Sequence, residues 1–123
     1  MPSTEDITSF IQGTFLSAWA LELLALLMRN PETRYSHEEM VAALRASDLV
    51  VTQSVNALSA AGLLLSEADG AARYAPASSE LAGLAEAAIA LYTTGPDAVR
   101  RMIVSAANPS ISAFADAFRL RKD

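Results

Sequence analysis

The sequence predicts a mainly α-helical domain with one two-stranded β-hairpin in its middle. Apolar residues recur at helical spacing along most of the chain, and helix-capping residues separate the successive segments. One segment differs: the run 63–67 and the run 72–75 are short and strand-like, and Asp69-Gly70 between them is a strong turn signal. With 123 residues, of which 52% are hydrophobic, the chain is long enough for one domain with its own core.

The N-terminal half begins with one extended helix, predicted over residues 7–28. It is apolar on nearly all sides, which indicates burial on two faces. Asn30-Pro31 ends it, because the residue before a proline avoids the helical region. A second helix is predicted over 36–45, since Ser36 and Glu39 have the spacing of a capping box.

A third helix is predicted over 49–61, with Gly62 as its C-cap. Val51, Val55 and Leu58 share one helical face and are expected to be buried. Four polar residues of this helix are then expected to point outward: Thr52, Gln53, Asn56 and Ser59.

Three further helices follow the hairpin, and they begin near Ser79, Pro96 and Asn108. We expect one structural domain, in which residues 77–123 pack on residues 1–76 or form a dimer interface. The apolar residues expected to face inward in the three helices are Leu81, Leu84, Ala88 and Leu91, then Val99, Met102, Ile103 and Ala106, then Ile111, Phe114 and Phe118.

The chain ends in a small basic cluster, Arg119, Arg121 and Lys122. Basic groups suit the C-terminal end of a helix, where they complement the helix dipole. The same cluster is also a candidate docking patch for an acidic partner.

The segment 21–75 resembles the winged helix-turn-helix core of bacterial transcriptional regulators of the MarR type. The resemblance depends on the helix from Ser36, the short turn 45–47, and the order of three helices followed by a hairpin. The run Val55, Leu58, Gly62, Leu63 matches the "V-x-x-L-x-x-x-G-L" pattern that ends the recognition helix in that family. The resemblance implies a winged helix-turn-helix regulator that binds DNA through helix 49–61 and the wing.

In that family the recognition helix enters the major groove and the wing contacts the DNA backbone. Carried over by position, Thr52, Gln53 and Asn56 would face base edges. Gln and Asn suit adenine, and a Thr methyl suits the methyl group of thymine. The other candidate DNA-binding residues are Arg45 and Ser47 near phosphates, and Arg73 near the backbone or the minor groove. The simpler interpretation is that these side chains form a solvated helix face.

The charge distribution favours an alternative function. Residues 1–76 contain four basic and nine acidic groups, helix 49–61 has no Lys or Arg, and the wing tip contains Glu67 and Asp69. A DNA-binding surface is normally basic. The alternative is a winged-helix adaptor that binds another protein and not DNA.

Other classes of function receive little support from the sequence. The absence of Cys excludes thiol chemistry, and no spacing indicates a catalytic triad, a phosphate loop or a cofactor site, so we expect no enzyme and no cofactor. His37, Glu38 and Glu39 are consecutive, which indicates an exposed helix start and not a metal site.

The apolar stretch 15–28 is too short to span a membrane, and the polar N-terminus is no secretory signal, so we expect a cytoplasmic protein. The high hydrophobic content favours a homodimer.

Overall fold

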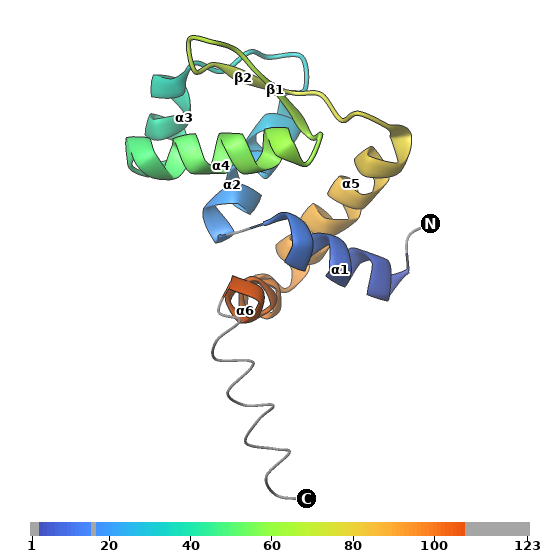
Figure 1. Cartoon of the computed structure of the whole chain (residues 1–123). Helices are drawn as coiled ribbons and strands as arrows, with labels where there is room; N and C mark the ends of the chain where they lie inside the picture. Colours follow the sequence, from blue (N-terminus) through green and yellow to red (C-terminus); the bar gives the residue numbers. More distant parts are fainter. Residues whose placement is uncertain (1–2, 16, 108–123) are drawn as a thin grey trace, which may run out of the picture.

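A computed structural model describes residues 3–15 and 17–107 of the chain. This part is mainly helical, with one small antiparallel sheet (Figure 1). Its elements are α1 (Thr4–Thr14), α2 (Ala18–Arg29), α3 (His37–Leu44), α4 (Asp48–Ala60), β1 (Leu64–Ser66), β2 (Ala72–Tyr74), α5 (Ser79–Thr94) and α6 (Pro96–Ala107).

The N-terminal region corrects one prediction: the single helix expected over 7–28 is wrong. The chain forms α1 and α2, whose directions differ by 109°. Phe15 leaves the helix with an extended backbone (φ −101°, ψ 119°), and Ser17 is the N-cap of α2. The physical reason is burial: Ile11 and Phe15 are almost fully buried, as are five of the twelve residues of α2. One straight helix that is apolar on nearly all sides would leave part of this surface in water.

The predicted capping residues mark the start of α3 and the end of α4. Ser36 and Glu39 form the predicted capping box at the start of α3, with N–O distances of 3.1 and 2.9 Å. Gly62 follows α4 with a φ of +80°, a left-handed conformation that glycine adopts without strain. Val51, Val55 and Leu58 are buried as predicted.

The hairpin also forms where the sequence predicts it. β1 pairs with β2 in the register Leu64↔Tyr74, and Gly70 makes the turn with a φ of +90°. A further bridge was not predicted: the backbones of Tyr35 and Ala72 exchange two hydrogen bonds, each 2.9 Å long. This bridge ties the connection between α2 and α3 to the outer side of the hairpin.

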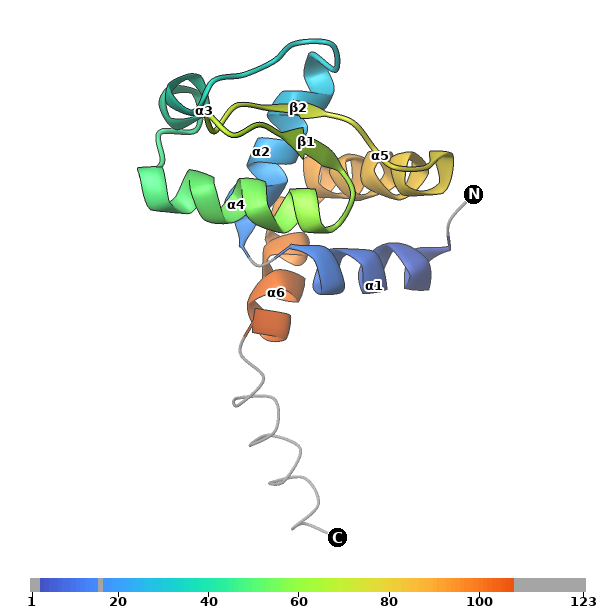
Figure 2. The ribbon, with the colours of Figure 1, turned by 45° about the horizontal axis from the view of Figure 1, so that its top comes forward.

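The core lies around α2, which contacts α3, α4, β2 and α5. Helices α5 and α6 contact each other and α1, so the C-terminal part packs on the N-terminal part (Figures 1 and 2). The inner face of α5 is rotated from the prediction: Ala85, Ala88 and Tyr92 are buried, whereas Leu84 is only partly buried. In α6, Val99 and Ile103 are buried as predicted. The helix expected from Asn108 lies outside the described residues, with its apolar and basic side chains.

Among the described helices, none is by itself both long and apolar enough to cross a membrane. Helices α1 and α2 reach the required length only as a pair, and that pair is sharply bent.

Candidate nucleic-acid interface

The outward face of α4 carries three of the residues predicted to contact DNA. Thr52, Gln53 and Asn56 are all exposed. Gln53 and Asn56 lie on the side of the helix opposite Val51 and Leu58, which are fully buried, and Thr52 lies at the edge of that side. The buried stripe therefore fixes which side of α4 faces outward.

Ser59 does not belong to this face, although the sequence predicted that it would point outward. The residue is only partly exposed, and its Oγ atom is buried. In helical projection Ser59 lies near the edge of the buried stripe, about 80° from Val51 at 100° per residue. The outward face is accordingly narrower than predicted.

The turn between α3 and α4 places Arg45 and Ser47 at the start of this face. Arg45 is exposed and has a left-handed backbone (φ 54°, ψ 40°), while its N–H donates to the carbonyl of Val41. The Oγ of Ser47 accepts a hydrogen bond from the N–H of Val50 at 3.1 Å. Ser47 is therefore the N-cap of α4, a role that was not predicted from the sequence.

An acidic group also stands at the start of α4. The side chain of Asp48 is 86% exposed, and its Oδ1 lies 3.0 Å from Nε2 of His37. A carboxylate here stabilises the helix dipole. It also puts negative charge beside Arg45 and Ser47, the two residues expected to lie near phosphates.

The hairpin holds Arg73, which is exposed on β2 opposite Leu65. Near the hairpin turn, Arg34 forms ion pairs with Glu67 and Asp69. The pKa of Asp69 is lowered by a hydrogen bond from the N–H of Ala71 and, secondarily, by Arg34. The bond to Glu67 raises the pKa of Arg34. Arg34 thus partly neutralises the acidic wing tip.

A hollow of about 530 Å³ lies between the start of α2 and the outward face of α4. Gln53 and Asn56 line it together with Trp19, whose surface is 40% exposed. Leu49, one turn before Gln53, is 64% exposed. The face of α4 is therefore uncharged and partly aromatic. Sequence spacing could not indicate this neighbourhood, because Trp19 reaches it from another helix.

A second polar cluster joins α2, α5 and α6. The hydroxyl of Tyr92 donates to Oε1 of Glu22 at 2.5 Å and accepts from Nη2 of Arg100 at 3.2 Å. The guanidinium of Arg100 also lies 5.7 Å from the centre of the Tyr92 ring. Burial raises the pKa of Tyr92, and the bond to Glu22 adds to the shift. These groups satisfy one another, so the cluster acts as a tie between helices.

The remaining chemistry of the described residues is sparse. Within the described ranges, no three His, Asp or Glu side chains come close enough together to hold a metal ion. Comparison with known protein families, with curated proteins and with solved structures gave no match.

Proposed function

We propose that residues 18–76 form a winged helix-turn-helix, and that the protein is a transcriptional regulator that binds DNA through α4 and the hairpin. The order α2, α3, α4, β1, β2 supports this architecture. The observation that carries the functional proposal is the pair of exposed carboxamides, Gln53 and Asn56, on the outward face of α4. Carboxamides in the major groove pair with adenine, and exposed Thr52 beside them suits a thymine methyl.

The groups around this face supply the contacts to the DNA backbone. Arg45 lies at one end of the face, in the turn before α4, and Arg73 lies on the hairpin. Two copies of the chain would present two α4 helices to successive turns of the DNA, about 34 Å apart. A homodimer would also double the number of arginines that contact phosphates, which an acidic chain needs.

The test is selection of genomic fragments by the purified protein, followed by binding of the best fragment across a salt series. We expect a common, roughly palindromic site, with affinity that falls as salt rises. Gln53→Ala combined with Asn56→Ala should abolish or relax the sequence preference while the protein stays folded. Gln12→Ala, an exposed glutamine on α1, is the matched control. Equal selection by the double variant and the control would contradict base reading by α4.

A protein-binding adaptor is the second candidate, and one observation favours it specifically. The face of α4 has no basic residue, and the exposed apolar groups Trp19 and Leu49 border it. Uncharged surfaces with an aromatic residue are typical of the centres of protein interfaces. Recovery of no DNA above background, even at low salt, would favour this function. Leu49→Lys should then disrupt binding to the protein partner, and Gln12→Ala should not.

A further inference from the structure

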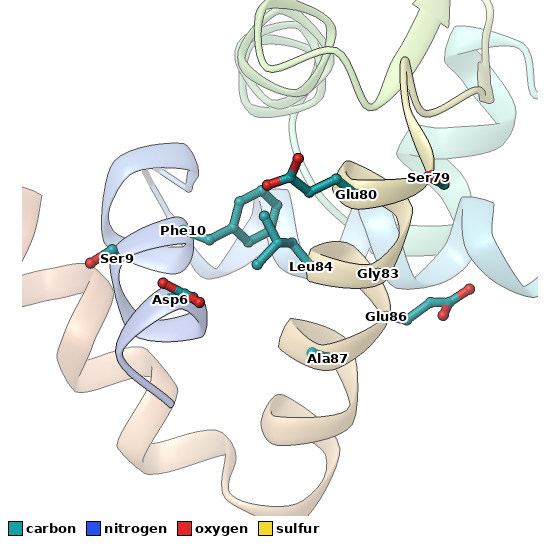
Figure 3. Close-up of a pocket in the computed structure, with 9 residues that line it drawn as sticks. All are labelled: Asp6, Ser9, Phe10, Ser79, Glu80, Gly83, Leu84, Glu86 and Ala87. Atoms are coloured by element: carbon teal, nitrogen blue, oxygen red, sulfur yellow. The ribbon is translucent and has the colours of Figure 1, made fainter. Parts of the chain in front are cut away.

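A groove of about 1090 Å³ runs between α1 and α5, and it shares no lining residue with the hollow beside α4. Apolar side chains line its centre: Phe10 from α1, and Leu84 and Ala87 from α5, are all half-buried (Figure 3). The sequence predicts that Leu84 faces the core, but the rotation of α5 leaves it in the wall of the groove. Gly83 leaves further room, because a Cβ atom added there would meet nothing within 4 Å.

The two helices that form the groove have acidic groups and no basic ones. Their charged side chains are four carboxylates, Glu5 and Asp6 on α1 and Glu80 and Glu86 on α5. Asp6 and Glu80 lie on opposite sides of the apolar centre, whereas Glu86 points away from α1 (Figure 3). Among the described residues, no Lys, Arg or His forms an ion pair with any of the four. The groove therefore has an apolar centre between two acidic rims that no described side chain neutralises.

This charge disfavours three kinds of occupant. A nucleic acid or an anionic lipid surface would bring further negative charge to the rims, and like charges repel. A two-fold dimer through this face would place the carboxylates of one copy against those of the other, because such an interface joins the same patch on both copies. The groove therefore favours a different protein that carries positive charge, and a homodimer would use another surface.

The walls of the groove indicate the form of that partner. Both walls are helices, whose backbone groups are largely paired within the helix, so they offer no strand edge to an extended peptide. An amphipathic helix that lays its apolar face between the walls is the mode of recognition that remains. The volume of about 1090 Å³ also exceeds the roughly 300–1,000 Å³ of a typical small-molecule site, which favours a peptide.

We propose that the groove between α1 and α5 binds a basic amphipathic helix of another protein. The apolar side of that helix covers Phe10 and Leu84. Lysines or arginines on its two flanks pair with Asp6 and Glu80. The proposal stands whether or not α4 binds DNA, because the two surfaces have no lining residue in common.

The probe is a synthetic helical peptide with leucines along one face and lysines on both flanks of that face, titrated into the full-length protein. The backbone amide signals of Phe10, Gly83 and Leu84 should shift as the peptide is added. The signals of Gln53 and Asn56 on α4 should keep their positions, and they serve as the internal reference. A second peptide, with glutamates in place of the lysines, keeps the apolar stripe. It should bind about tenfold more weakly, because the rims repel its charge.

Variants of the groove separate shape from charge. Gly83→Phe should abolish binding by filling the groove, whereas Gly83→Ala should retain it. Asp6→Asn combined with Glu80→Gln should weaken binding of the lysine peptide about fivefold and make it less sensitive to salt. Glu32→Gln combined with Glu38→Gln is the matched control, because it removes two exposed carboxylates that do not line the groove.

Three results would overturn the proposal. The first is the absence of shifts at Phe10, Gly83 and Leu84 at low salt and millimolar peptide in a well-folded protein. The second is equal binding of the lysine and glutamate peptides, which would remove charge from the recognition. The third is a shift of the same signals when the protein alone is concentrated, which would assign the groove to a second copy of the chain.

Discussion

Nε2 of His37 lies 3.0 Å from Oδ1 of Asp48, and this contact joins the first residue of α3 to the first residue of α4. His37 also borders the hairpin turn, because a Cβ atom added to Gly70 would lie 3.4 Å from the Cβ of His37. The side chain of His37 therefore lies beside the first residue of α4 and beside Gly70 in the hairpin turn.

We expect this pair to contribute little to overall stability. The carboxylate of Asp48 is 86% exposed, so His37→Ala and Asp48→Ala should show a coupling free energy below about 1 kcal/mol in a double-mutant cycle. Urea unfolding of the four proteins measures it. A coupling of several kcal/mol would mean that the contact is far less solvated than the structure shows.

Leu58 should be a major contributor to stability. Its side chain is fully buried, so Leu58→Ala should destabilise the protein by about 2–5 kcal/mol. Leu49→Ala, on the same helix but 64% exposed, should change stability by no more than about 0.5 kcal/mol. Equal effects of the two substitutions in thermal unfolding would refute the orientation of α4.

The left-handed backbone of Arg45 should lower the stability of the protein. Among the residues that the structure describes, Arg45 is the only non-glycine residue with a positive φ. A left-handed conformation costs an ordinary residue about 1 kcal/mol or more. Arg45→Gly should therefore raise the free energy of unfolding by about 1 kcal/mol. If Arg45 contacts a phosphate, the same variant should bind DNA more weakly and with a shallower dependence on salt.

Arg45→Asn separates these two effects. Asparagine tolerates the left-handed conformation and has no charge. It should keep most of the gain in stability and lose the same affinity for DNA. Unchanged DNA affinity in both variants would remove Arg45 from the proposed interface.

The capping box of α3 should make stability depend on pH. The pKa of Glu39 is lowered, chiefly because its carboxylate accepts a hydrogen bond from the N–H of Ser36. When the pKa of a carboxyl group is lower in the folded state than in the unfolded state, the group stabilises the folded protein at pH values above its unfolded pKa. This contribution is lost as the pH falls through the folded value. Glu39→Gln should therefore flatten the acid limb of a stability-against-pH profile, while Glu38→Gln should leave it unchanged.

The parts of the fold that depend on local signals were predictable. Ser36 with Glu39, Gly62 and Asp69-Gly70 each act within a few residues, and each marks the observed end of an element. The buried stripe of α4 was predictable for the same reason, because Val51 and Leu58 repeat at helical spacing. The exposure of Gln53 and Asn56 follows directly from that stripe.

The features that the sequence did not predict depend on residues distant from one another. The break between α1 and α2 has a weak local signal, since Ser17 makes no side-chain capping bond and burial of Phe15 decides the path. The bridge between Tyr35 and Ala72 and the groove between α1 and α5 join segments far apart in the chain. Neither periodicity nor capping carries information about such pairings.

Trp19 gives the protein a built-in optical reporter. It is the one tryptophan of the chain, its ring is partly exposed, and it borders the same hollow as Gln53 and Asn56. A molecule that covers the face of α4 must change the hydration of this indole, and with it the wavelength and intensity of its emission. Intrinsic fluorescence of the unlabelled protein will thus register an occupant of that face, whether the occupant is a DNA duplex or another protein.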